Sequence, residues 1–340
     1  MSTRQGDDPG GANPGAAQVV SADDPAARVL GRPAALEALA DPEQAAGRVL
    51  DATHRVEHTV TLGDGRTVFV TETFTLRSWL RTPRRAAMLL PGYVTLGSAW
   101  NIAVPGYDGG ARLAAEEFFA FAVDYVGFGR SSCPADGSGL RPRDEVDPLR
   151  SVLEYVRDRR GVRDGVDVVA ESLGSGIAIM LAADTALVRS ATLTTILYEG
   201  TSDTVQQMML SSAHRDELEA WSDGYLVTDA AYYAAVTAES PPVVAEWIAA
   251  TQPGRYPTGL FLGLFEGLPY FDPGAARAPG LVLVGARDVV PAPGEAAALA
   301  RDYGPDGAAL VELDAAGHVP RFGTHASADA YWAEVLGFIR

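Results

Sequence analysis

The sequence of 340 residues contains no lysine, so all 27 of its basic residues are arginines. They are outnumbered by 44 acidic residues, and the formal net charge at pH 7 is -17. Such an acidic chain repels the phosphate backbone of a nucleic acid, because phosphate neutralisation requires clustered positive charge. We therefore expect no nucleic-acid partner. The missing lysine, beside abundant alanine, glycine and arginine, indicates a bacterial genome of high GC content.

Cysteine is nearly absent as well, since Cys133 is the only one in the chain. A single cysteine cannot form an intrachain disulfide, which fits the reducing environment of the cytoplasm. Cys133 lies in a loop of Ser, Pro and Gly with no neighbouring base, and we assign it no catalytic role. No group of His, Cys and Asp has the spacing of metal ligands. We expect neither a metal nor a cofactor.

Long apolar runs are also missing. No stretch of about 18 residues is apolar and free of charge, so no membrane-spanning helix is predicted. Residues 1–25 are rich in Gly, Pro, Ala and Asp and lack the apolar stretch of a signal peptide. They are predicted to form a disordered tail. The remaining chain is predicted to be globular, because 47% of the residues are apolar and 21% are charged. The single cysteine favours a cytoplasmic location.

Strand and helix patterns alternate along much of the chain. Apolar alternation on both sides of the sequence GDG, residues 63–65, predicts a β-hairpin over residues 58–62 and 67–74. Further strands are predicted over residues 86–90, 120–125, 166–170 and 191–198, with helices over residues 111–119, 146–159 and 173–183. This order is typical of βαβ units, and it predicts an α/β fold with a mostly parallel central sheet and helices on both faces.

The alternation stops over residues 200–274, where helical patterns carry many Met, Trp, Tyr and Phe residues. It resumes with a strand over residues 280–284, a helix over 295–303, a strand over 309–313 and a final helix over 327–339. We therefore predict a core of residues 26–199 and 275–340, interrupted after the sixth strand by a helical cap of residues 200–274. Met208, Met209 and the aromatic side chains of this cap either line an apolar acyl pocket or only pack the cap onto the core.

The strongest local signal for chemistry is the segment VVAESLGSG, residues 168–176. An apolar strand runs through Ser172 into a helix of small residues. A sharp turn of this kind strains the serine backbone, so the residues two before and two after must be small. Ala170 and Gly174 meet this requirement. The pattern favours Ser172 as a nucleophile, and the alternative is a serine that only caps the helix.

Residues 124–131, with the sequence DYVGFGRS, resemble the segment that precedes this serine turn in the α/β-hydrolase superfamily. With the cap left out, the resemblance extends over about residues 55–340. It implies a catalytic triad whose members follow one another in the order Ser172, Asp288, His318. His318 stands in the family's place for the general base, after a predicted strand and before the last helix. Asp288 lies in GARDVVP, residues 285–291, which resembles the segment carrying the acid.

Two further assignments depend on this resemblance. Some members of the superfamily carry the acid one strand earlier, and Glu199 is therefore the alternative to Asp288. The sequence Pro91-Gly92-Tyr93 stands where the superfamily usually has His-Gly. The resemblance implies that the backbone N–H groups of Tyr93 and Leu173 form the oxyanion hole.

The resemblance implies a serine hydrolase that cleaves an ester of a small, largely apolar molecule through an acyl-enzyme on Ser172. A thioesterase, or a chain-releasing, acyl-transferring or cyclising enzyme of bacterial secondary metabolism, remains an alternative. A third possibility is a non-catalytic protein that binds a small ligand on the same fold, although such a protein has no need of a complete triad. Epoxide hydrolases and haloalkane dehalogenases carry a carboxylate where this chain has Ser172. The sequence leaves the oligomeric state open.

Overall fold

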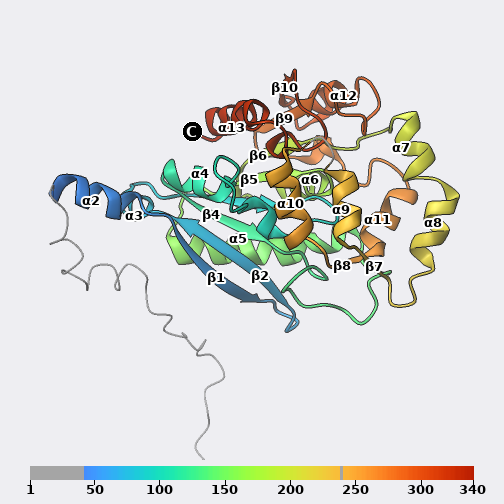
Figure 1. The fold of residues 1–340 in the computed structure, drawn as a ribbon, viewed down its shortest axis with the longest axis horizontal. Coiled ribbons are helices and arrows are strands. Elements are labelled where there is room, and N and C mark those ends of the chain that lie inside the picture. The colour runs from blue at the N-terminus through green and yellow to red at the C-terminus, as the bar shows by residue number, and fades with distance from the viewer. Residues whose placement is uncertain (1–41, 238–239) are drawn as a thin grey trace, which may run out of the picture. The chain divides into compact units, whose positions relative to one another are not determined.

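A computed structural model describes residues 42–237 and 240–340 (Figure 1). The predicted tail of residues 1–25 and the first part of the predicted core lie outside the described residues. The chain divides into two units, residues 1–48 and 49–340. Of the first unit, only the beginning of helix α2 (Pro42–Asp51) is described.

Eight strands of the second unit form one sheet in the order β1-β2-β4-β3-β5-β6-β9-β10. Strands β1 and β2 form an antiparallel hairpin, and β2 also runs antiparallel to β4. All other pairs in this sheet are parallel, which confirms the predicted sheet type. The strands are β1 (His54–Thr61), β2 (Thr67–Phe74), β3 (Arg85–Leu90), β4 (Phe118–Val123), β5 (Val166–Glu171), β6 (Val188–Thr194), β9 (Gly280–Gly285) and β10 (Ala309–Leu313).

Helices cover both faces of the sheet, and side chains alternate between the two faces along each strand (Figure 1). In β5, Val168 and Ala170 belong to one apolar cluster and Val169 to the other. The first cluster includes residues of α5, α6 and α12, and the second includes residues of α4 and α13. The helices are α3 (Leu76–Leu80), α4 (Gly109–Ala115), α5 (Val146–Arg160), α6 (Leu173–Asp184), α12 (Glu295–Asp302) and α13 (His325–Ile339).

Two predicted elements extend several residues beyond their ends in the structure. The helix predicted over residues 111–119 ends at Ala115, and strand β4 already begins at Phe118. Of the two residues between them, Glu117 has a φ of 66°, which lies outside the helical and strand regions. The strand predicted over residues 191–198 ends at Thr194, because the following Thr195 has a φ of 50°. Glu199 therefore lies in a loop beyond the strand.

The inserted segment, residues 200–274, leaves the sheet after β6 and returns before β9. In Figure 1 its helices are coloured yellow to orange and lie in the right half of the view. It also contains a two-stranded antiparallel sheet of β7 (Tyr225–Val227) and β8 (Arg255–Pro257), which the helical prediction missed. The side chain of Met208 is not among those described. The helices are α7 (Asp203–Met208), α8 (Ser212–Glu219), α9 (Ala230–Val236), α10 (Pro242–Thr251) and α11 (Thr258–Phe265).

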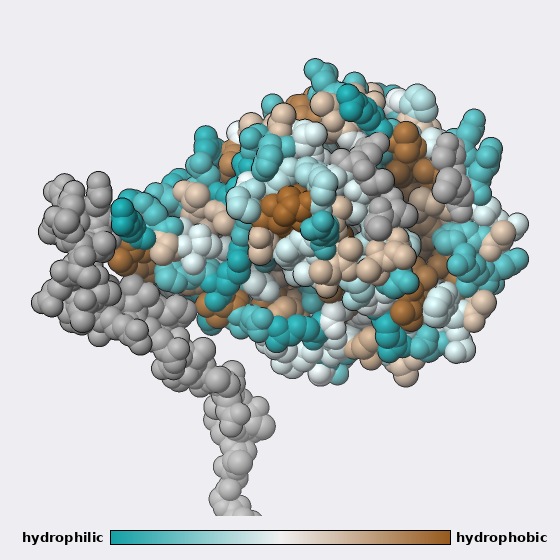
Figure 2. Space-filling view, viewed as in Figure 1, coloured by the Kyte–Doolittle hydropathy of each residue, from teal (hydrophilic) through white to brown (hydrophobic). Residues whose placement is uncertain are grey.

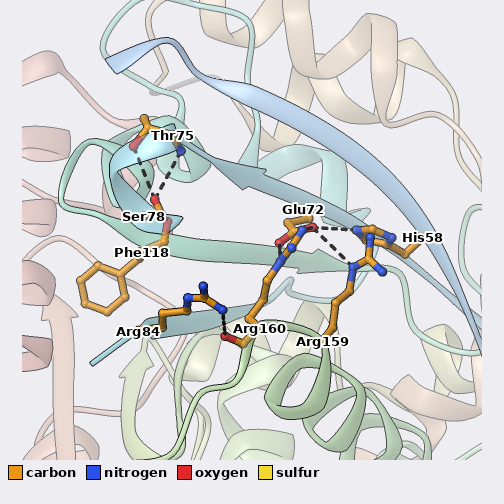
Figure 3. A network of polar contacts seen from close by, with 8 residues as sticks. All are labelled: His58, Glu72, Thr75, Ser78, Arg84, Phe118, Arg159 and Arg160. Carbon is orange, nitrogen blue, oxygen red and sulfur yellow. Dashed lines mark hydrogen bonds and ion pairs between the residues drawn. The ribbon is translucent and has the colours of Figure 1, made fainter. Parts of the chain in front are cut away.

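A buried polar network connects β1, β2 and α5 (Figure 3). The Arg160 guanidinium donates two hydrogen bonds to the carboxylate of Glu72, and His58 Nε2 lies 2.8 Å from the same carboxylate. Arg160 also lies 4.3 Å above the ring of Trp79. A charged pair that is buried in this way is tolerated when each charge finds a partner with good geometry.

The molecular face drawn in Figure 2 is largely polar, with apolar residues in separate patches. Among the described residues, no helix has both the length and the apolar character that a membrane crossing requires.

Candidate active site

The turn predicted at Ser172 forms between β5 and α6. Ser172 has φ 48° and ψ -119°, a strained conformation for a residue with a side chain. A Cβ at Gly174 would lie 2.6 Å from the carbonyl oxygen of Pro91 and 2.7 Å from the hydroxyl oxygen of Tyr125. Position 174 therefore requires glycine. The sequence predicts a small residue two positions after Ser172, and these close contacts explain why no larger residue fits there.

His318 lies within hydrogen-bonding distance of both Ser172 and Asp288. The Nε2 atom of His318 is 3.3 Å from Oγ of Ser172, and its Nδ1 atom is 3.1 Å from each carboxylate oxygen of Asp288. The three residues follow β5, β9 and β10, whose carboxyl ends meet at one edge of the sheet. The side chain of Asp288 is fully buried, whereas that of His318 is 30% exposed. A proton can therefore pass between Ser172 and an imidazole that is oriented from its other side.

The alternative acid, Glu199, does not take part in this arrangement. Its residue is exposed, and its backbone N–H donates to the carboxylate of Glu295. Within residues 42–237 and 240–340, no hydrogen bond connects the Glu199 side chain to His318. The structure thus brings Asp288, and not Glu199, to the imidazole.

The residues assigned to the oxyanion hole lie beside the serine. A Cβ at Gly92 would be 3.3 Å from Cβ of Ser172, so the loop after β3 closely approaches Ser172. In the part of the chain that the structure describes, the backbone N–H groups of Tyr93 and Leu173 donate to no protein acceptor. Free N–H groups next to a nucleophile are what an oxyanion hole requires.

Side chains of the inserted segment make hydrogen bonds to the loop after β3. Gln252 is fully buried: its Oε1 accepts from the N–H of Leu96 at 2.8 Å, and its Nε2 donates to Ser98 Oγ at 3.0 Å. The hydroxyl of Tyr233 donates to the carbonyl of Val94 at 2.6 Å. Val94 has a φ of 55°, so these bonds hold a strained part of the loop in place. This support cannot be predicted from local sequence patterns, because the partners are far apart along the chain.

The segment of residues 124–131 supports the site and does not enter it. The Asp124 carboxylate accepts from the N–H groups of Gly97 at 2.8 Å and Arg130 at 3.1 Å. Burial raises the pKa of Asp124 above its ordinary value. A Cβ at Gly129 would lie 2.2 Å from Asp124 Oδ2, so the glycine at that position is required.

A buried ion pair next to Ser172 was not predicted from the sequence. Glu171 immediately precedes Ser172 and pairs with Arg321, the third residue after His318. The available signal was a glutamate directly before the serine, at the end of a strand that is buried throughout. Among the described residues, no group of three or more His, Cys, Asp or Glu side chains could hold a metal ion.

A model of the alpha/beta hydrolase family matches residues 87–333, which is more than half of the sequence. The chain therefore belongs to the alpha/beta hydrolase family, as its sheet and the turn at Ser172 indicate. No curated protein matches the sequence.

Several solved structures are similar over most of the chain. An E-2-(acetamidomethylene)succinate hydrolase is 19% identical, with a TM-score of 0.61 over 84% of this chain and 99% of its own. An esterase from Exiguobacterium antarcticum is 14% identical, with a TM-score of 0.63 over 84% of this chain and 99% of its own. The thioesterase domain from the curacin biosynthetic pathway is 16% identical, with a TM-score of 0.58 over 82% and 98%. At such low identity these similarities show the fold alone.

Proposed function

We propose that this protein is a serine hydrolase that cleaves an ester of a small, largely apolar molecule through an acyl-enzyme on Ser172. The proposal is carried by two contacts of His318, one with the Ser172 hydroxyl and one with the Asp288 carboxylate. Ser172 itself lies in a strained turn. A serine that only caps a helix needs neither that strain nor an imidazole at its hydroxyl.

In the first half of the reaction, Oγ of Ser172 attacks the ester carbonyl carbon while Nε2 of His318 takes the hydroxyl proton. The carbonyl oxygen becomes an oxyanion that accepts hydrogen bonds from the N–H groups of Tyr93 and Leu173. The tetrahedral intermediate collapses, the bond to the alcohol oxygen breaks, and the alcohol leaves with the proton from Nε2.

In the second half, water attacks the acyl-enzyme. His318 takes a proton from the water as its oxygen bonds to the acyl carbon, and the bond to Oγ then breaks. Ser172 regains its proton and the carboxylic acid is released. Throughout, ionised Asp288 accepts the hydrogen bond from Nδ1–H of His318 and stabilises the imidazolium. None of these steps needs a metal or another cofactor.

The preference for apolar substrates is supported by an apolar cluster of the inserted segment. Tyr93 and Tyr270 pack against this cluster, and the hydroxyl of Tyr270 donates to the carbonyl of Leu173 at 3.2 Å. The cluster therefore reaches both residues whose N–H groups we assign to the oxyanion hole. We propose that the inserted segment is a cap and that an acyl chain on Ser172 lies against this cluster. Its buried members are Leu218, Phe261, Leu262 and Leu264.

Thioesterases and acyl-transferring or cyclising enzymes use the same acyl-enzyme and differ in the leaving group or in the second nucleophile. The formal net charge of -17 disfavours docking of an acidic carrier protein. We therefore place the ester of a small molecule first.

The direct test is hydrolysis of p-nitrophenyl butyrate by the wild type and by Ser172→Ala. The account predicts that kcat falls by about 10⁴- to 10⁶-fold while the melting temperature stays close to that of the wild type. Cys133→Ser is the matched control, because it removes the only thiol of the chain and is expected to leave kcat unchanged. Full turnover by Ser172→Ala would refute the proposal.

A further inference from the structure

We infer that Arg321 is a positioning residue for the proposed reaction, because its guanidinium fastens together the three chain segments that form the site. The inference rests on the proposed function. Arg321 does not touch the reacting atoms, and it acts through the backbone positions of Ser172, His318 and the loop after β3.

The contacts of Arg321 reach each of these segments. Its Nε and Nη2 atoms donate to the two carboxylate oxygens of Glu171, with Nη2 at 2.8 Å, and Glu171 is bonded directly to Ser172. Its third nitrogen, Nη1, donates to the carbonyl oxygen of Ala99 in the loop after β3. Arg321 itself belongs to the segment that carries His318. One planar cation thus links the proposed nucleophile, the oxyanion loop and the base.

The link from Arg321 to His318 is short and stiff. Val319 and Pro320 are the only residues between them, and Pro320 begins a short 3-10 helix that ends at Phe322. The proline ring fixes the backbone φ at its position and so restricts how the backbone of His318 can move relative to that of Arg321. Fixing Arg321 against Glu171 therefore limits how far Nε2 of His318 can move from Oγ of Ser172, now 3.3 Å away.

The guanidinium has no freedom of its own. Arg321 is 1% exposed and Glu171 is 3% exposed. The guanidinium carbon lies 4.0 Å above the ring of Trp100 and 3.9 Å above that of Phe322. Stacked and doubly hydrogen-bonded in this way, an arginine cannot be replaced by lysine, whose point charge has no planar fork.

The chain provides a matched control in the pair of Glu72 and Arg160 (Figure 3). There too a buried arginine makes two hydrogen bonds to a buried glutamate and stacks on an aromatic ring. This second pair joins β2 to α5 and has no contact with Ser172 or His318 among the described residues. Replacing the arginine should lower the stability of the protein in either pair. Only replacement in the pair of Glu171 and Arg321 should also lower kcat.

The experiment compares Arg321→Lys and Glu171→Gln with Arg160→Lys in the full-length protein. For each, kcat and KM for p-nitrophenyl butyrate, the rate of labelling by a fluorophosphonate and the melting temperature are measured. We expect Arg321→Lys and Glu171→Gln to lower kcat by about 10- to 100-fold with KM within about threefold, since small misplacements of reacting groups have effects of this size. The labelling rate should fall in parallel. Arg160→Lys should lower the melting temperature and leave kcat of the folded protein unchanged.

Two results would overturn the inference: kcat within about threefold of the wild type for folded Arg321→Lys or Glu171→Gln, or an equal loss of kcat in Arg160→Lys. If Arg321→Lys does not fold, Glu171→Gln answers the same question, because it preserves the side-chain shape and one acceptor oxygen. Ser172→Ala is measured in the same series. Activity that survives in Ser172→Ala refutes the proposed function, whereas activity lost there but kept in Arg321→Lys refutes the positioning role alone.

Discussion

Replacing Asp288 by asparagine tests which group orients His318. The Oδ1 atom of Asp288 accepts a hydrogen bond from the N–H of Val290 at 2.9 Å. In Asp288→Asn the amide oxygen keeps this position, because the Val290 N–H needs an acceptor. The amide nitrogen then takes the place of Oδ2, 3.1 Å from Nδ1 of His318.

This exchange reverses the direction of the hydrogen bond. An amide NH₂ group donates, so a hydrogen bond from it to Nδ1 requires Nδ1 to accept, and the imidazole proton then lies on Nε2. That nitrogen faces Oγ of Ser172 and can no longer take its proton. In serine hydrolases with the same arrangement, the wrong tautomer lowers kcat by about 10⁴-fold, which corresponds to about 5 kcal/mol in the activation free energy.

The assay is kcat for p-nitrophenyl butyrate at neutral pH, with the melting temperature as a check on folding. Glu199→Gln is the matched control: Glu199 is exposed, and its backbone bond to Glu295 survives the change. We expect this control to stay within about twofold of the wild type, as is usual for a surface change away from the site. A larger loss of activity in Glu199→Gln than in Asp288→Asn would refute the reasoning and make Glu199 the acid.

Three further predictions concern the surroundings of the triad. From acetate to longer p-nitrophenyl esters, kcat/KM should rise by up to about fourfold per methylene, from about 0.8 kcal/mol for each buried CH₂; a steady fall from acetate onward would contradict the apolar cap. In Gly174→Ala the new Cβ displaces the helix start that carries the Leu173 N–H, so kcat should fall by at least about tenfold; an unchanged kcat would show that this N–H does not contribute. Burial raises the pKa of Glu145 to about 8 from 4.5. Because the folded-state value is the higher one, stability is lost as pH rises from about 4.5 to 8, and Glu145→Gln should increase the free energy of unfolding in urea more at pH 9 than at pH 5; an equal change at both pH values would be inconsistent with a buried neutral carboxyl.

Local patterns were sufficient to predict most of the sheet. The hairpin of β1 and β2 follows from a glycine turn, and Gly65 adopts the positive φ of 87° that such a turn needs. Two predicted elements end too late, and both observed ends fall where a residue other than glycine adopts a positive φ. Glu117 and Thr195 end a helix and a strand in this way, and neither residue type predicts such a conformation.

The candidate site could be predicted only in part for a related reason. Ser172, Asp288 and His318 each follow a strand, and in a parallel sheet such positions lie at one edge. The groups that support them come from distant parts of the chain. Glu171 and Arg321 are 150 residues apart, and Leu96 and Gln252 are 156 apart. Contacts of this range depend on tertiary packing, which helix and strand periodicities do not describe.

The most direct test of the central claim is covalent labelling of the pure protein with a fluorophosphonate, followed by mass spectrometry of its peptides. The account predicts one adduct, located on Ser172, with the loss of esterase activity proportional to the labelled fraction. It also predicts no adduct in Ser172→Ala. An adduct on a different residue, or esterase activity that persists after complete labelling of Ser172, would contradict the assignment of Ser172 as the nucleophile.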